Sequence, residues 1–272
     1  MVTIYFSGTG NTKYIAELFS RIMGTECLSI EEEANFSMLI NSHDTIIFCY
    51  PIYGSRVPLI MREFVAAHLT ELKGKRIAIF VTQLMFSGDG ARVLCDLFPS
   101  GHIEVIYAEH FRMPNNICNI ALLRMKNSKN IKKRLIRAEK TMENVCRNIK
   151  AGIVKKKGFS AVSRLLGKIQ GKPWQGDSKN AFAEESSMEN RAKHGIKIDN
   201  DCTICKVCVE ICPMKNLETK NGAISHKNNC TACYRCVNRC PQKAITVLLH
   251  NKPKWQYKGI DGKGMNLFIC HI

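Results

Sequence analysis

Short apolar runs alternate with amphipathic segments through residues 1–152. Nearly continuous apolar runs, with the length and β-branched content of buried strands, occupy residues 2–6, 26–30, 44–50, 75–83 and 102–111. Apolar positions at helical spacing occupy residues 13–23, 57–69, 89–98 and 128–152, the last ending at Gly152. Buried strands separated by helices predict a parallel sheet with helices on both faces, an α/β fold.

The alternation stops at residue 153. Residues 153–196 are basic, contain scattered Gly and Ser with Pro173, and show no strong period. We interpret them as a basic connector between an N-terminal domain, residues 1–152, and a compact cysteine-rich domain, residues 197–250. Residues 251–272 then form a C-terminal tail.

The cysteine-rich domain contains an internal repeat. CTICKVCVEICP begins at Cys202 and CTACYRCVNRCP begins 28 residues later at Cys230, and both read C-x2-C-x2-C-x3-C-P. Three thiolates on one tight loop can hold three corners of a cubic 4Fe–4S cluster, and the fourth cysteine of such a run serves the other cluster. The spacing therefore predicts two 4Fe–4S clusters with crossed ligands. One set is Cys202, Cys205, Cys208 and Cys240; the other is Cys230, Cys233, Cys236 and Cys212.

A pair of zinc sites is the alternative for these cysteines. Structural zinc usually takes paired C-x2-C units or cysteines with histidines, whereas a third cysteine followed by C-P is not that pattern. The stretch from Lys197 to Leu249 resembles the bacterial-type two-cluster ferredoxins, which implies electron transfer. The remaining cysteines show no ligand spacing and are expected to be small buried hydrophobic residues: Cys27, Cys49, Cys95, Cys118, Cys146 and Cys270.

A second motif, SGTGNT, lies between the first strand and the first helix. Its glycines let main-chain N–H groups converge on an anion, its hydroxyls add donors, and the helix dipole adds positive potential. The motif lacks the lysine of a P-loop and the G-x-G-x-x-G spacing of a dinucleotide site. It predicts a phosphate site, with a plain capped turn as the alternative. The predicted site comprises Ser7, Gly8, Thr9, Gly10, Asn11 and Thr12.

Residues 1 to about 150 resemble flavodoxin, whose phosphate loop has the form S/T-x-T-G-x-T. The resemblance implies a doubly wound parallel sheet of order 2-1-3-4-5 with FMN at the switch point. It also implies two loops over the flavin ring, at the ends of the third and fourth strands. Candidate ring-binding residues are Tyr50, Pro51, Tyr53 and Gly54 in the first loop and Thr82, Phe86, Gly88 and Asp89 in the second.

Two features of these loops leave the flavin environment open. Aromatic residues at strand ends are also ordinary core residues, so stacking on the ring is one of two interpretations. Flavodoxins are acidic near the ring, whereas this chain has Arg56, Arg62 and Arg92 in the corresponding region. The direction in which the protein shifts the flavin potential therefore does not follow from the sequence.

The whole chain resembles a flavodoxin–ferredoxin fusion, with a small α+β ferredoxin-like domain after the flavodoxin-like one. The resemblance implies an electron carrier of anaerobic-type metabolism, holding FMN and two 4Fe–4S clusters. A flavin-dependent reductase of a small acceptor, fed through the clusters, is the alternative, and a redox-responsive nucleic-acid-binding protein is a more remote one. No residue stands out as a catalytic acid or base, and the eight histidines are scattered.

Charge and cysteine content bear on location and partners. The formal net charge is +17, with Lys and Arg dense between Arg124 and Lys197. This fits either a solvated helix face with a basic linker, or a surface for an acidic partner. We expect acidic redox proteins, with nucleic acid less favoured. No signal segment is evident and no apolar run is long enough for a membrane span, so we expect a cytoplasmic chain. Disulfides are rare in the cytoplasm. We therefore expect the cysteines to be bound to clusters. Its oligomeric state stays open.

Overall fold

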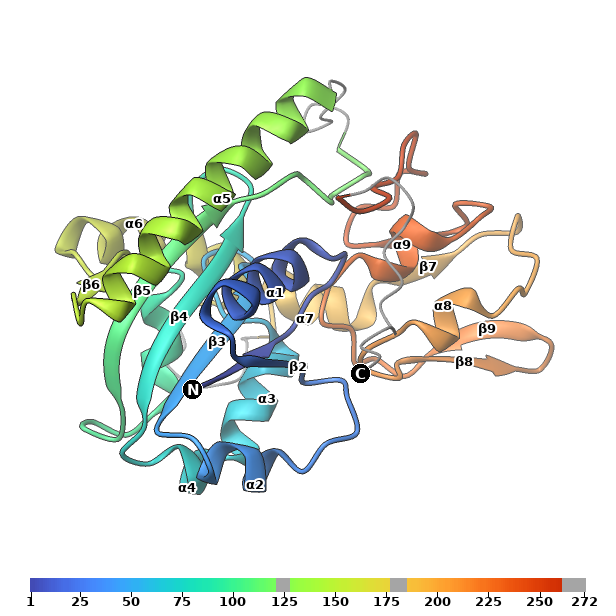
Figure 1. Ribbon diagram of the computed structural model, residues 1–272. Helices are drawn as coiled ribbons and strands as arrows, with labels where there is room; N and C mark the ends of the chain where they lie inside the picture. The colour runs from blue at the N-terminus through green and yellow to red at the C-terminus, as the bar shows by residue number, and fades with distance from the viewer. Residues whose placement is uncertain (121–127, 177–184, 261–272) are drawn as a thin grey trace.

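The fold was analysed in a computed structural model, which describes residues 1–120, 128–176 and 185–260. A parallel sheet forms the centre of the N-terminal part (Figure 1). Its order is β2-β1-β3-β4-β5-β6, which confirms the predicted order 2-1-3-4-5 and adds a short sixth edge strand. The strands are β1 (Val2–Tyr5), β2 (Glu26–Ser29), β3 (Thr45–Pro51), β4 (Arg76–Gln83), β5 (Glu104–Arg112) and β6 (Lys155–Lys156).

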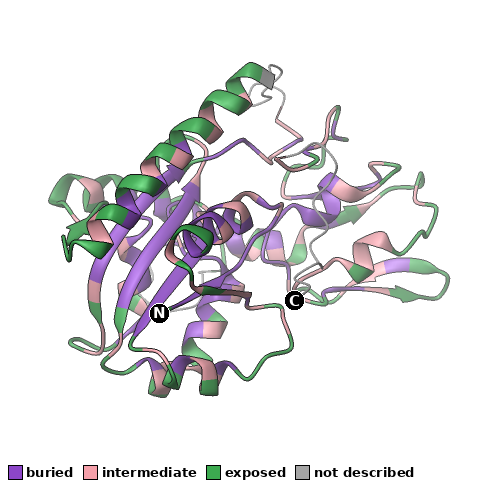
Figure 2. Ribbon diagram, in the orientation of Figure 1, coloured by how far each residue is buried: buried purple, intermediate pink, exposed green. Residues whose placement is uncertain are grey.

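Helices cover both faces of this sheet, as its buried strands require. On one face, α1 and α5 pack together against β3, β4 and β5. On the other face lie the shorter α2, α3 and α4 with a 3-10 segment. The bounds are α1 (Asn11–Met23), α2 (Phe36–Asn41), α3 (Leu59–Ala67), α4 (Leu69–Leu72) and α5 (Ser128–Lys150). Figure 2 shows the central strands buried along most of their length, while α5 presents its outer side to solvent.

The prediction of a helix over residues 89–98 was wrong. Only a 3-10 segment, Arg92–Leu97, forms there. The first residues of the stretch are held as a loop, because Gly90 N–H bonds the Ser87 carbonyl and the Tyr50 hydroxyl donates to the Gly90 carbonyl.

The connector is more regular than its sequence suggests. It contains β6, a fifteen-residue helix α6 (Ala161–Gln175) and the short helix α7 (Met188–His194). Helix α6 begins at the Ser160 N-cap, whose hydroxyl accepts from the Ser163 N–H. The α6 glycines Gly167 and Gly171 and a proline near its end obscure the period, although both glycines are buried.

The C-terminal domain is small and built from two antiparallel strand pairs and two short helices. Strand β7 pairs with β10, and β8 pairs with β9. The elements are β7 (Ile196–Ile198), α8 (Val207–Glu210), β8 (Leu217–Lys220), β9 (Ala223–His226), α9 (Arg235–Arg239) and β10 (Ile245–Val247). This α+β domain lies beside the carboxyl-terminal end of β1, with α9 next to α1 (Figure 1).

Candidate cofactor sites

The predicted phosphate loop lies at the carboxyl end of β1 and leads directly into α1. Gly10 adopts a left-handed conformation (φ 101°) and donates its N–H to the Ser7 hydroxyl, at 3.0 Å, which curls the loop. Within the described residues, no acceptor is bonded to the main-chain N–H groups of Thr9, Asn11 and Thr12. Free N–H groups at the start of a thirteen-residue helix are suited to an anion. The loop therefore fits a phosphate group.

Two neighbouring loops support the phosphate loop. The Thr12 hydroxyl is 2.8 Å from that of Thr82, at the end of β4. Asn116, which follows β5, donates its amide to the Thr9 hydroxyl at 3.0 Å, and Asn11 donates to the Pro114 carbonyl at 2.7 Å. The loop after β5 is thus part of the site, although no sequence motif indicated it.

A cavity of about 390 Å³ extends from the phosphate loop. That volume is within the range of sites for a single organic ligand or cofactor. Apolar surface dominates its walls, which come from both domains and the connector. The predicted residues among them are Ser7, Gly8, Thr9, Asn11, Thr12, Pro51, Tyr53, Gly54 and Thr82. The walls not predicted include Asn116, Trp174, Met188, Ala232, Tyr234 and Leu248.

One side of the cavity is closed by Tyr53 and Gly54 of the first ring loop together with Trp174 of α6. The Tyr53 and Trp174 rings lie 6.0 Å apart at a tilt of 51°. Gly54 has φ +54°, and a Cβ there would come within 2.3 Å of the Trp174 Cβ. Glycine is therefore required twice, by conformation and by space. This packing holds α6 against the loop and makes Trp174 part of the cavity wall.

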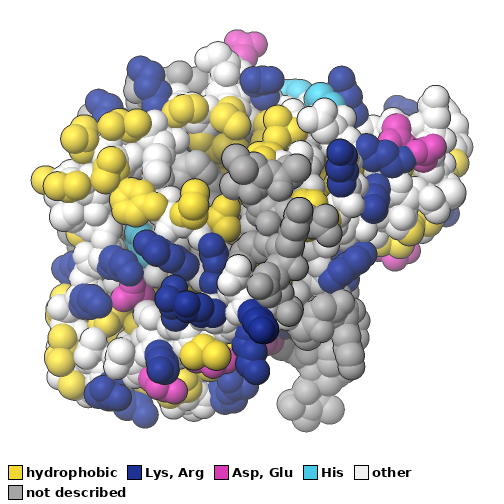
Figure 3. Space-filling view, turned by 90° about the horizontal axis from the view of Figure 1, so that it is seen from above, with side chains coloured by type: hydrophobic (Ala, Val, Ile, Leu, Met, Phe, Trp, Pro, Cys, Tyr) yellow, Lys and Arg dark blue, Asp and Glu magenta, His cyan; other side chains and the backbone are white. Residues whose placement is uncertain are grey.

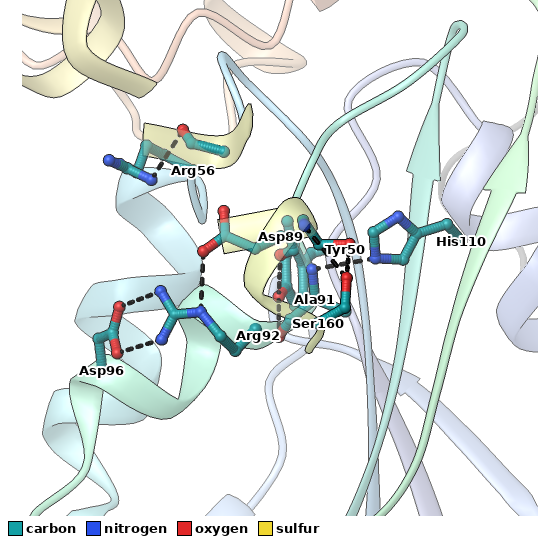
Figure 4. Close-up of polar contacts among 11 residues, drawn as sticks. Tyr50, Arg56, Asp89, Ala91, Arg92, Asp96, His110 and Ser160 are labelled. Carbon is teal, nitrogen blue, oxygen red and sulfur yellow. Dashed lines mark hydrogen bonds and ion pairs between the residues drawn. The ribbon is translucent and has the colours of Figure 1, made fainter. Parts of the chain in front are cut away.

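Four predicted ring-binding residues do not line this cavity. Tyr50 is in the core, and its hydroxyl donates to the Gly90 carbonyl at 2.9 Å (Figure 4). Phe86 is half exposed, Gly88 packs against α6, and Asp89 is buried in an ion pair with Arg92. The residues that line the cavity are those at and after the end of β3, including Pro51 and Tyr53, whereas Tyr50 lies within the strand. The second ring loop reaches the cavity through Thr82.

The three arginines do not put free charge at the cavity either. Arg92 pairs with Asp89 at 2.8 Å and with Asp96 at 2.7 Å (Figure 4). Arg62 is buried, donating to the Val57 carbonyl and pairing with Glu189 at 2.5 Å. Arg56 points toward the Gly167 carbonyl of α6. The positive charge that the sequence suggested near the flavin ring is largely neutralised.

The cysteine repeat folds into two small cavities, each with one predicted ligand set in its wall. One is lined by Cys202, Cys205, Cys208 and Cys240 and is called the outer set here. The other is lined by Cys212, Cys230, Cys233 and Cys236 and is called the inner set. Each of the two cavities thus brings together the cysteines of one predicted set. No group of three or more His, Cys, Asp or Glu in the described ranges converges on a single metal ion; a cubic cluster spaces its four thiolates more widely.

The two cysteine loops have the same unusual backbone. Ile204 and Lys206 of the first loop have φ of 54° and 61°, and their counterparts Ala232 and Tyr234 have 55° and 60°. Left-handed conformations at residues with side chains are strained and persist where the structure around a functional site imposes them. The repeat in the sequence is thus matched by a repeat in the backbone of the two loops.

Main-chain N–H groups also bond the thiols. Asn216 donates to the Cys212 sulfur, Ala244 to Cys240, and Ala232 to Cys230, each at 3.3 Å. Such bonds stabilise thiolates and raise the reduction potential of clusters that the sulfurs hold.

The two cysteine sets differ in exposure. Cys205 of the outer set is exposed, whereas Cys230, Cys233 and Cys236 of the inner set are buried. Burial raises the pKa of the Cys230 thiol to about 12 and that of Cys233 to about 11. At neutral pH these thiols would keep their protons unless positive iron stabilised the thiolates. Among the other described cysteines, Cys49, Cys118 and Cys146 are buried and Cys27 and Cys95 half-buried, while Cys270 lies outside the described residues.

The inner set contacts the phosphate loop directly. A Cβ on Gly8 would come within 2.7 Å of the Cys233 carbonyl oxygen, so the two loops touch without an intervening side chain. Tyr53 is half-buried with its hydroxyl enclosed beside Cys233, and within the described residues that hydroxyl has no hydrogen-bond partner. Ala232 and Tyr234, on either side of Cys233, line the large cavity. The inner cysteine loop is therefore a wall of the candidate flavin site.

Arg235 joins the two domains at this contact. Its side chain is buried and donates to the carbonyls of Gly8, Ser7 and Ile211, at 3.0, 2.8 and 2.9 Å. Both its terminal nitrogens also lie 2.7 Å from the Glu31 carboxylate. Because Arg235 holds the Ser7 and Gly8 carbonyls, the N–H groups of the phosphate loop remain available to bind an anion. No signal in the sequence points to Arg235, because it lies inside the cysteine motif and contacts a distant segment.

Comparisons with known proteins agree with these features. Residues 2–152 match the family described as flavodoxin domain, and residues 184–245 match the 4Fe-4S dicluster domain. No curated protein matches the chain.

Solved structures similar to the chain include a reduced flavodoxin from Megasphaera elsdenii, at 23% identity and a TM-score of 0.36, with 52% of this chain and 99% of that one covered. A flavodoxin from the domain Archaea shares 16% identity at a TM-score of 0.37, with 55% and 97% covered. A putative flavoprotein from Bacteroides eggerthii shares 19% at 0.37, with 55% and 96% covered.

Proposed function

Because this chain belongs to the flavodoxin domain family and carries a 4Fe-4S dicluster domain behind that domain, we propose that it is a single electron-transfer unit. The flavodoxin domain implies FMN and the dicluster domain implies 4Fe–4S clusters. FMN can exchange electrons singly or in pairs, and the clusters exchange them singly. The shared cavity wall supports the proposal most directly, since Ala232 and Tyr234 of the inner cysteine loop line the same cavity as the phosphate loop.

The chain's own residues would hold each group. Main-chain N–H groups of Thr9, Asn11 and Thr12 would bind the phosphate, and the hydroxyls of Ser7, Thr9 and Thr12 shape the loop around it. Pro51, Tyr53, Gly54 and Trp174 would form the apolar wall beside the ring. The outer and inner cysteine sets would each ligate one cluster.

The difference in exposure between the two cysteine sets suggests which cluster exchanges electrons with a partner. The outer set, with Cys205 exposed, would face a partner, whereas the loop that carries the buried inner set lines the large cavity through Ala232 and Tyr234. Lys206 is exposed beside Cys205, and the chain carries a net charge of +17, so we propose an acidic redox protein as that partner. A cytoplasmic, anaerobic-type setting also remains our proposal.

A carrier role is favoured over a reductase. The cavity of about 390 Å³ is near the lower end of the range for organic ligands. One flavin would occupy most of it, with little room for a separate acceptor.

The test is cofactor analysis followed by reductive titration of protein purified without oxygen. We expect about eight iron and eight sulfide per chain and one FMN, with each centre reduced by electrons supplied through the others. Full clusters with no flavin after incubation with FMN would contradict the flavin site. Retained FMN that is reduced only by a direct chemical reductant, and not through the clusters, would contradict a single unit.

A further inference from the structure

Helix α6 presents an apolar stripe to solvent. Val162, Leu165 and Ile169 are 67%, 61% and 61% exposed, and Leu166 between them is 36% exposed. Their spacing of three and four residues places them on one side of the helix. Apolar side chains of this size that stay in water across several turns mark an interaction surface more often than chance.

The opposite side of α6 is firmly seated. Gly167 lies against Asp89 and Gly171 against Arg56, so closely that a Cβ on either would collide. Gln170 accepts a hydrogen bond from the Ser55 hydroxyl at 2.6 Å, and Trp174 is buried in the cavity wall. The helix is therefore held by its small residues and cannot turn its apolar stripe inward.

A loop packed against α6 also exposes apolar side chains. Met85 and Phe86 are 61% and 49% exposed, and the same loop contacts α6 where Gly88 meets Gly167. Figure 3 shows hydrophobic side chains gathered on one part of the surface, with Lys and Arg side chains alongside them. We call α6 together with Met85 and Phe86 the apolar ridge.

The charges beside the ridge select its partner. Arg164 and Lys168 are exposed, four residues apart on a helix that contains no Asp or Glu. A second copy of the chain would bring the same basic residues against themselves, which is unfavourable. Nucleic acid would engage the basic residues and leave the apolar stripe in water. An anionic lipid surface accepts both features, the stripe among the acyl chains and the basic residues among the headgroups.

We propose that the apolar ridge docks this protein on the surface of a bilayer that contains anionic lipids. The helix would lie in the plane of the interface, and the protein would associate peripherally and reversibly. In the described part of the chain no helix is long and apolar enough to cross a membrane. The inference does not depend on the electron-transfer proposal.

The test is flotation of the full-length, cofactor-loaded protein with lipid vesicles. One set of vesicles is pure phosphatidylcholine and the other contains a minority of phosphatidylglycerol. We expect binding to the anionic vesicles, with an affinity that falls as salt is raised. The double variant Leu165→Ser/Ile169→Ser should lower that affinity by on the order of tenfold or more, since two large apolar side chains no longer enter the bilayer.

A matched control variant tests whether the loss of vesicle binding is specific to the apolar ridge. Met38→Ser/Ile22→Ser removes two exposed apolar side chains from α2 and α1 and should bind as the parent does. Because all four positions are exposed, both variants should fold and retain their cofactors. Three results would overturn the proposal: no binding to either vesicle, salt-sensitive binding equal in both variants, or self-association that the ridge variant alone abolishes.

Discussion

Removing the Arg235 side chain should uncouple the flavin site from the inner cysteine loop. Its guanidinium is 2% exposed and holds the Ser7 and Gly8 carbonyls on one side and Glu31 on the other. In Arg235→Met the apolar volume is largely kept, while every one of these hydrogen bonds is lost. The phosphate loop then loses the contacts that orient its two peptide groups.

The size of the expected loss in FMN affinity follows from the contacts that Arg235 makes. Leaving one partner of a buried ion pair without the other costs roughly 3–5 kcal/mol. Glu31 retains 21% side-chain exposure and can be rehydrated, so we expect the lower end of that range. A buried carbonyl that loses its donor adds about 1–3 kcal/mol. If half of the lower-end ion-pair penalty, about 1.5 kcal/mol, falls on the loop, FMN should bind about tenfold more weakly, because about 1.4 kcal/mol is a factor of ten.

The assay is an anaerobic titration of FMN fluorescence into flavin-depleted protein that retains its clusters. Arg235→Lys keeps the charge but loses the two-pronged contact, so its affinity should fall between those of the parent and the Met variant. Lys227→Met breaks the exposed pair with Glu218 in the same domain, and it should change FMN affinity little. FMN affinity in Arg235→Met equal to that of the parent, with iron content unchanged, would refute the reasoning.

Further outcomes can be checked with the same protein. Gly8→Ala, whose Cβ would come within 2.7 Å of the Cys233 carbonyl, should lower FMN affinity about tenfold through overpacking, as measured by the titration above. Trp174→Ala should also release FMN more readily, and Trp174→Phe should restore most of the affinity if the ring acts as a wall. Cys205→Ser should reduce iron content without changing FMN affinity, whereas Cys233→Ser should reduce both; equal effects on FMN would argue against an inner and an outer set. Burial lowers the pKa of His110 to about 4. The contribution of this group to the free energy of unfolding, at most roughly 3 kcal/mol, is therefore fully present above about pH 6.5 and is lost as the pH falls toward 4. The NMR signals of His110 should stay those of a neutral imidazole at pH 5.5, and titration near pH 6.5 would contradict this.

Features fixed by local spacing were predictable from the sequence. The phosphate loop needs a strand, a glycine-rich turn and a helix in succession, and these appear together in SGTGNT. The gathering of the cysteines into two sets was predictable because a 28-residue repeat places equivalent cysteines in equivalent turns. The sheet order was predicted from the resemblance to flavodoxin, which rests on the phosphate-loop motif.

Features that depend on contacts between distant segments were not predictable. Trp174 and Arg235 reach the flavin site from parts of the chain far from its motifs, and neither carries a sequence signature of its own. Helix α6 has no strong period in the sequence, because its two glycines interrupt the apolar positions; in the fold these glycines allow close packing against Asp89 and Arg56. The structure places Tyr50 in the core, with its hydroxyl donating to the Gly90 carbonyl. Two nearby aromatic residues do not by themselves indicate which ring lies at the cavity.

The inner cysteine loop bears on how the protein matures. Ala232 and Tyr234 hold left-handed conformations that a loop without bound iron has little reason to keep, and both line the flavin cavity. Insertion of iron and sulfide would therefore complete the pocket, and flavin would be retained well only afterwards. A cell short of iron would then accumulate chains that lack both kinds of cofactor, so its iron supply would also set how much flavin this protein sequesters.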